Sequence, residues 1–243
     1  MITAGEVQDA GRTPWQGGGV RLLLVRHGQT PANVLHLLDT GVPGPGLTEL
    51  GREQAASLVD TLGPEGIGAI TASTQVRAQL TAAPLAAHLG LEVAVDGGLR
   101  EIEAGEVEMR GDDEAVARYF AVVTAWVRGD LAAALPGAPD GHAFFERYDA
   151  AIDAAAARAR EAGADTLAVV SHGAAIRTWA AVRARGLSPR FVLSTGLLNT
   201  GVVDLRGDPG AGWTCETWMG AAVGRQQADA AGAGPAGEPG SVF

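Results

Sequence analysis

The stretch that decides the fold is VRLLLVRHGQT at residues 20–30, in which an aliphatic run stops abruptly at Arg26, His27 and Gly28. A short apolar run bounded by glycine is typical of a strand buried on both faces of a parallel sheet. Side chains that follow such a strand emerge at its carboxyl end, where open α/β sheets bind their ligands. The run therefore predicts both a central strand and the edge at which a functional site lies.

A second stretch repeats this arrangement. LAVVSHG at residues 167–173 resembles LLLVRHG at residues 22–28, since each is an aliphatic run that ends in His-Gly. His27 and His172 would leave the same edge of the sheet, and the glycine after each leaves space beside the backbone for a ligand. We expect the two histidines to face one another.

Strand and helix patterns alternate along the chain. Apolar runs predict strands at residues 20–25, 67–70, 91–95, 166–170, 201–205 and 213–218. The segments between them have helical spacing, as in Ala55, Leu58 and Leu62 after a capping Thr48. The turn sequence RGDPGAG joins the last two strands and indicates a hairpin. The pattern predicts an α/β fold, a three-layer α/β/α sandwich with a mostly parallel central sheet that includes one antiparallel strand.

The domain boundaries follow from composition. Residues 1–19 and 221–243 are rich in glycine, alanine and proline and lack periodic apolar residues, so we expect flexible tails there. Residues 20–220 are expected to form one domain. The aromatic residues Trp126, Phe144, Phe145 and Tyr148 are expected to belong to its core rather than to a binding cage.

Charge and composition exclude several kinds of partner. The net charge is −10, which argues against nucleic acid or a membrane surface held by a basic face. All eighteen basic residues are arginine, so lysine-dependent chemistry is excluded. The single cysteine, Cys215, forms neither an internal disulfide nor a multi-cysteine metal site. Without a signal sequence or a membrane-spanning run, the expected location is the cytoplasm. A homodimer is compatible with the sequence but not specified by it.

The candidate site is cationic. The predicted strand at residues 67–70 leads into a helix with Arg77 near its start, so Arg77 leaves the same edge as Arg26, His27 and His172. Free backbone N–H groups at a helix N-terminus favour an anion. These side chains predict a phosphate-sized site that contains no metal.

Five separated blocks resemble one family. The residues are Arg26 to Thr30 with Asn33, LTELGREQA at 47–55, ASTQVRAQLTA at 72–82, LREIEAG at 99–105 and VVSHG at 169–173. In this order they resemble the histidine phosphatase superfamily, the phosphoglycerate-mutase-like proteins. The resemblance spans residues 20–205 and implies a phosphomonoesterase that acts on a small-molecule phosphomonoester, with no cofactor and no metal.

The resemblance also implies a role for each matching residue. His27 is the nucleophile that becomes phosphohistidine, Glu101 is the proton donor, and His172 completes the catalytic set. Arg26 and Arg77 bind phosphoryl oxygens together with His172. A neutral imidazole is a competent nucleophile, and fixed positive charge stabilises a phosphoryl transition state.

Two interpretations apply to Thr30 and Asn33. The resemblance implies that they are auxiliary donors to the phosphoryl group, whereas their position after a strand also suits a helix cap. The acid role has rivals too, since Glu103 and Glu106 follow Glu101 closely.

Two other functions stay open at this point. A phosphoglycerate-mutase-type phosphotransferase needs a lid and extra cationic groups. The interval of 71 residues from Glu101 to His172 is short, and its arginines are scattered, so hydrolysis is favoured. A non-catalytic phospholigand-binding module is the third reading, since a fold does not prove an activity. Where the family often has glycine, this chain has Met109-Arg110, and the natural ester is not readable from the sequence.

Overall fold

The computed structural model describes residues 19–223. Within that range an eight-stranded sheet has the order β3-β2-β4-β1-β6-β7-β5, with β8 paired to β7. The strands are β1 Val20–Arg26, β2 Ile67–Ser73, β3 Val93–Asp96, β4 Thr166–Ser171, β5 Ala184–Arg185, β6 Val202–Asp208, β7 Gly212–Trp218 and β8 Ala221–Ala222. All six strands expected from the sequence are present, and the two-residue strands β5 and β8 are additions.

The strand directions agree with the predicted fold class. β1, β2, β3 and β4 pair in parallel, while β6 is antiparallel to both β1 and β7. The expected hairpin is therefore β6–β7. One boundary needs correction, because Ala221–Ala222 lie in the expected C-terminal tail yet pair with Thr217 and Trp218 as a second antiparallel strand. Val223, also in the expected tail, is buried in the core, while residues 1–18 and 224–243 lie outside the described residues.

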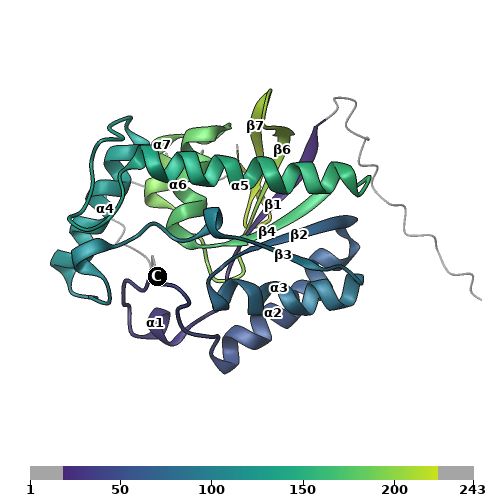
Figure 1. The fold of residues 1–243 in the computed structure, drawn as a ribbon, viewed down its shortest axis with the longest axis horizontal. Helices are drawn as coiled ribbons and strands as arrows, with labels where there is room; N and C mark the ends of the chain where they lie inside the picture. Colours follow the sequence, from purple (N-terminus) through teal and green to yellow (C-terminus); the bar gives the residue numbers. More distant parts are fainter. Residues whose placement is uncertain (1–18, 224–243) are drawn as a thin grey trace, which may run out of the picture.

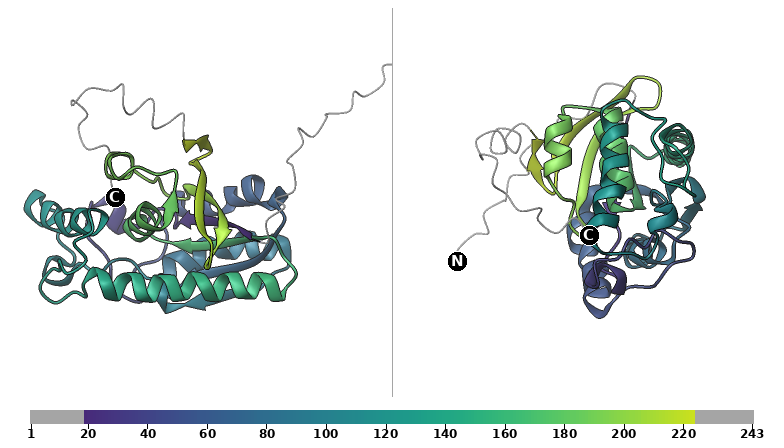
Figure 2. Two further views of the ribbon diagram at one scale, coloured as in Figure 1. Left: turned by 90° about the horizontal axis from the view of Figure 1, so that it is seen from above. Right: turned by 90° about the vertical axis from the view of Figure 1, so that its left-hand side faces the viewer.

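Helices cover both faces of the sheet (Figure 1). They are α1 Pro31–Val34, α2 Glu49–Leu62, α3 Val76–Leu89, α4 Asp113–Val127, α5 Gly141–Glu161, α6 Gly173–Arg183 and α7 Pro189–Ser194, with short 3-10 turns at Gly63–Glu65, Gly97–Leu99 and Gly105–Val107. The long helix α5 runs along one face, and Figure 2 shows it seen from above. Helices α2 and α3 lie on the opposite face.

The layers on the two faces follow from the alternating directions of the side chains along each strand. Leu22 and Leu24 of β1 belong to the core on the side of α5, and Leu23 and Val25 belong to the core on the side of α2 and α3. Successive side chains of a strand point to opposite faces, so a strand covered on both sides must be apolar throughout. This explains why the sequence of β1 is a continuous aliphatic run.

The aromatic cluster is core, as expected. Trp126, Phe144, Phe145 and Tyr148 are all at most 2% exposed. Cys215 is also buried, and burial raises the pKa of its thiol to about 12, which keeps it protonated and unreactive. No helix within residues 19–223 is both long and apolar enough to cross a membrane.

The start of α2 holds the loop that follows β1. Thr48 caps α2, its hydroxyl accepting a hydrogen bond from the Gly51 N–H at 3.0 Å. The Thr48 N–H donates to the Gln29 carbonyl at 2.9 Å, and the Gln29 N–H donates to Gln54 Oε1 at 2.8 Å. A Cβ atom at Gly51 would lie 2.1 Å from the Gln29 carbonyl oxygen, so the approach requires glycine.

We therefore expect Gly51→Ala to destabilise the protein. The added methyl meets backbone rather than a flexible side chain, so the helix and the loop must separate, at a cost of about 1–3 kcal/mol. Urea unfolding measures the free energy. Ser57→Ala, on the exposed face of the same helix, is the matched control and should change it by less than about 0.5 kcal/mol. Equal stability of the two variants would contradict the close approach.

Candidate active site

Two histidines lie side by side at the carboxyl ends of β1 and β4. The strands pair in parallel with Arg26 opposite Ser171, so the residue after each strand is a histidine. The His27 N–H donates to the Ser171 carbonyl at 3.0 Å, which continues the pairing into the loop. The ring centroids of His27 and His172 are 5.2 Å apart with planes 55° apart. The expectation that these residues face one another is confirmed.

Hydrogen bonding and burial set the tautomer and the charge of the His27 ring. Its Nδ1 atom is 2.7 Å from the Gly28 carbonyl oxygen, a contact that requires the proton on Nδ1. The lone pair is therefore on Nε2. Burial first, and then the charges of Arg77 and Arg26, hold the pKa of His27 well below its ordinary value of 6.5. The ring is neutral at physiological pH.

His172 is a buried ring at the start of α6. It is the N-cap residue of that helix and is 0% exposed. Neither ring nitrogen has a hydrogen-bond partner among residues 19–223. Burial, followed by the charge of Arg77, lowers its pKa well below 6.5. A neutral ring keeps one N–H, so His172 has a donor available to an incoming ligand.

Arg26 comes from the end of β1. Its Nη1 donates to the Leu197 carbonyl at 2.5 Å, while its Nε finds no partner in the described part of the chain. Burial lowers its pKa to about 10, which leaves it charged at neutral pH. A Cβ atom at position 173 would lie 3.2 Å from Arg26 Nε, so Gly173 leaves room for the guanidinium at the start of α6.

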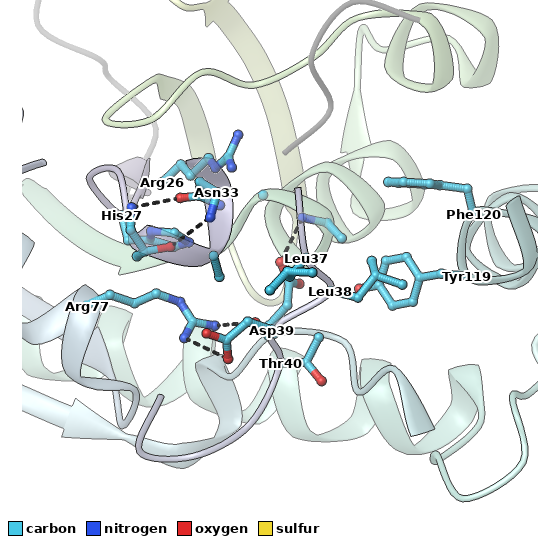
Figure 3. Close-up of a pocket in the computed structure, with 15 residues that line it drawn as sticks. Arg26, His27, Asn33, Leu37, Leu38, Asp39, Thr40, Arg77, Tyr119 and Phe120 are labelled. Atoms are coloured by element: carbon cyan, nitrogen blue, oxygen red, sulfur yellow. Dashed lines mark hydrogen bonds and ion pairs between the residues drawn. The ribbon is translucent and has the colours of Figure 1, made fainter. Parts of the chain in front are cut away.

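Arg77 lies in the first turn of α3, as the sequence predicts, and is 2% exposed. Its Nη2 donates to the Asp39 carbonyl at 3.0 Å, and Nη1 lies 3.8 Å from Asp39 Oδ1 (Figure 3). Nη1 has no hydrogen-bond partner within the described range. Burial raises the pKa of the Asp39 carboxyl, and this nearby residue is one that sequence reasoning missed.

Glu101 lies beside the start of α6. Its carboxylate accepts hydrogen bonds from the Ala174 N–H at 3.1 Å and the Ala175 N–H at 2.8 Å, and from the Ile102 N–H at 2.8 Å. The other two candidates for the proton donor are paired with arginines. Glu103 pairs with Arg100 and Arg147, and Glu106 pairs with Arg118. Glu101 alone of these three carboxylates lines the pocket described below.

Two further side chains hold Glu101 in place. Arg147 of α5 donates to the carbonyls of Gly98, Arg100 and Glu101 at 2.7–2.8 Å. Gln75, which is fully buried, accepts from the Glu101 N–H at 3.0 Å and donates to the Thr40 carbonyl at 2.8 Å. Sequence reasoning missed both as positioning residues, because neither belongs to a local pattern around Glu101.

Thr30 and Asn33 form a helix cap. The Thr30 hydroxyl accepts from the Asn33 N–H at 3.2 Å, and Asn33 Oδ1 accepts from the Thr30 N–H at 3.1 Å. The capping interpretation therefore holds for both, although both also line the pocket. Asn199, another residue that the sequence did not reveal, donates to Asn33 Oδ1 at 3.2 Å and to the His27 carbonyl at 3.0 Å.

Most of the predicted site residues line a small cavity of about 50 Å³, but His172 is not among its lining residues. Its walls include Arg26, His27, Thr30, Asn33, Arg77 and Glu101, with Leu37 to Thr40 and Tyr119 opposite (Figure 3). Burial lowers the local dielectric constant and strengthens the field of the two arginines. No cluster of three or more metal-ligating side chains occurs within residues 19–223. The arrangement is suited to bind a tetrahedral anion beside His27 Nε2.

Comparison with known proteins identifies the family. The family model described as "Histidine phosphatase superfamily (branch 1)" matches residues 22–219, which is most of the chain. The chain therefore belongs to the histidine phosphatase superfamily.

Curated relatives include a PE-PGRS family protein of Mycobacterium tuberculosis, 36% identical over 220 residues that are 86% of this chain and 38% of that protein. A glucosyl-3-phosphoglycerate phosphatase of the same species is 41% identical over 35% of this chain and 38% of its own length. The chain thus spans 38% of the length of these relatives. A probable phosphoglycerate mutase of Yersinia pestis is 31% identical over 65% of this chain and 71% of its own length.

Solved structures share the fold. A mycobacterial hydrolase has a TM-score of 0.70 and 28% identity, covering 84% of this chain and 100% of its own. The native structure of a mycobacterial glucosyl-3-phosphoglycerate phosphatase has a TM-score of 0.68 and 27% identity, with the same coverage of 84% and 100%. These similarities agree with the α/β fold with a mixed central sheet described above.

The buried histidines predict a loss of stability in acid. The folded chain keeps His27 and His172 neutral, whereas the unfolded chain protonates them near pH 6.5. The unfolded state then binds more protons, so the free energy of unfolding should fall as the pH drops below about 6.5, by up to about 1.4 kcal/mol per pH unit for each histidine.

Urea unfolding at about pH 7.5 and about pH 5.5 measures this loss. His172→Asn removes one of the two titrating groups and should lose less stability across that interval than the parent chain. Ser57→Ala, which changes no ionisable group, should lose as much as the parent. An unchanged loss in His172→Asn would show that the ring is not held neutral by folding.

Proposed function

We propose that this chain is a metal-independent phosphomonoester hydrolase that works through a phosphohistidine on His27. The observation that carries the proposal is the set of buried donors around that ring. Arg26 Nε, Arg77 Nη1 and both nitrogens of His172 have no hydrogen-bond partner among residues 19–223. A buried donor without a partner costs about 1–3 kcal/mol, more when it is charged. A phosphoryl group beside His27 would accept from all of these residues at once.

The reaction that we propose has two displacements. In the first, His27 Nε2 forms a bond to phosphorus while the bond from phosphorus to the ester oxygen breaks, and Glu101 gives its proton to the leaving alkoxide. In the second, water attacks the phosphohistidine, and Glu101 accepts a proton from that water. Inorganic phosphate leaves, and both side chains return to their starting forms. Arg26, Arg77 and His172 stabilise the equatorial oxygens in both steps.

Hydrolysis is favoured over transfer to a second substrate. Some relatives are phosphatases by name, and others are probable phosphoglycerate mutases, so the names alone do not separate the two activities. A mutase must keep water from its phosphohistidine. Three of the arginines between Glu101 and His172 have partners other than the cavity: Arg110 pairs with Asp112, Arg118 pairs with Glu106, and Arg147 binds loop carbonyls. Adding 2,3-bisphosphoglycerate and 3-phosphoglycerate distinguishes mutase activity from hydrolysis.

The proposed phosphohistidine can be detected directly. Brief mixing with a phosphomonoester labelled in its phosphoryl group should leave an acid-labile, base-stable label on the protein, since a phosphoramidate has those stabilities. His27→Ala should abolish both the label and the turnover of p-nitrophenyl phosphate. His142→Ala, at an exposed position, is the matched control and should keep both. Label that persists in His27→Ala would rule out His27 as the nucleophile.

A substitution at Glu101 tests whether this residue donates the proton to the leaving group. Glu101→Gln keeps the size of the side chain but cannot give a proton, so esters with poor leaving groups should suffer most. Alkyl phosphates should slow at least tenfold more than p-nitrophenyl phosphate, whose phenolate needs little protonation. Vanadate inhibition should change little, because the arginines and His172 provide the main contacts. Equal slowing of the two ester types would remove Glu101 from this role.

A further inference from the structure

A second cavity lies beside the proposed phosphoryl site. It has a volume of about 690 Å³, within the range of small-molecule pockets. Phe120 and Ala174 line both cavities, so the two adjoin. Its wall comes mainly from α4, α6 and α7, and its aliphatic part includes Val116, Val123, Val127, Val192 and Leu193. A ligand whose phosphoryl group lay beside His27 would have its remaining atoms next to this cavity.

One cation is buried in this wall. Arg177 of α6 is only 7% exposed, and its Nη2 donates to the Val192 carbonyl at 2.8 Å. Its Nε has no hydrogen-bond partner within residues 19–223. The next residue, Thr178, is 0% exposed, and its hydroxyl also lacks a partner in the described range. Arg177 and Thr178 both line this mostly apolar cavity, and each has one buried polar atom without a partner in the described range.

The surrounding charges favour an anion at Arg177. Burial lowers its pKa, and the charge of Glu101 opposes that effect. Arg177 in turn lowers the pKa of Arg26, which indicates that the two guanidinium groups repel one another. Glu101 is already bound to backbone N–H groups of α6, and Asp113, the acidic residue in the cavity wall, is exposed at the start of α4. A second anionic group on the ligand would relieve this repulsion.

We propose that this cavity holds the alcohol portion of the phosphomonoester and that Arg177 selects alcohols with a carboxylate on an apolar body. The proposal rests on the proposed function for the position of the phosphoryl group. A charged hydrogen bond to a carboxylate satisfies Arg177, and the aliphatic part of the wall covers the carbon skeleton. Arg177 thus determines specificity and does not take part in the chemical step.

Binding of non-hydrolysable phosphonates tests this without turnover. The probes are 3- and 4-(phosphonomethyl)benzoate and the two corresponding benzamides, which have the same shape without the charge. Calorimetry should give at least one acid that binds about tenfold or more tightly than its amide, as expected for a charged hydrogen bond. In Arg177→Gln the acid and the amide should bind within about twofold of each other.

A matched variant controls for net charge. Arg190→Gln removes one positive charge from an exposed position on α7 and should keep the preference for the acid. A preference that is absent from the parent chain, or that disappears equally in Arg190→Gln, would overturn the proposal. Absence of binding by all four probes would do the same.

A second variant tests the cavity even if Arg177→Gln fails to fold. Val116→Trp fills the cavity from a half-buried position on α4 and should weaken all four aryl probes at least fivefold relative to inorganic phosphate. Unchanged affinities would show that the ligand lies elsewhere. Turnover of p-nitrophenyl phosphate by the parent chain is scored separately. If turnover is absent but the preference for the acid is intact, the hydrolase proposal is wrong and the proposal for the cavity stands. If turnover is present but the preference is absent, only the proposal for the cavity is wrong.

Discussion

The parallel pairing of β1 with β4 is the constraint on which the site depends. Because the two strands are in register, with Arg26 opposite Ser171, their carboxyl ends release His27 and His172 at the same level. β4 also pairs in parallel with β2, so the helix that follows β2 starts at this edge and brings Arg77 there. A register shift of one residue in β1 would turn the side chains of that strand to the other face of the sheet and would separate His27 from His172. The pairing of the strands therefore determines where His27, His172 and Arg77 lie relative to one another.

Local patterns were sufficient to predict much of this arrangement. The aliphatic runs identified six strands, and the repeated His-Gly ending correctly indicated that His27 and His172 meet. The RGDPGAG turn correctly indicated the β6–β7 hairpin. These features were readable because each depends on residues close together in the sequence. Strand spacing and turn chemistry are local properties, and the parallel connection then determines which ends meet.

The residues that sequence reasoning missed act over long distances in the chain. Asn199 donates to the His27 carbonyl, and Arg147 binds the loop that carries Glu101. Neither lies in a recognisable pattern, and an arginine on a helix is more often exposed than bound to carbonyl groups. The strands β5 and β8 have two residues each, too few for an alternation pattern. Such features depend on how distant segments pack, which a single sequence does not encode locally.

The buried donors around His27 bear on how fast inorganic phosphate leaves the site. In the proposed reaction, Arg26, Arg77 and His172 would contact the phosphoryl oxygens rather than the alcohol, so inorganic phosphate would satisfy them as well as an ester does. The contacts that favour the transition state would then also retain the product. For an enzyme built in this way, departure of phosphate competes with chemistry as the slowest step. The ambient phosphate concentration would set the share of molecules that are free to accept substrate.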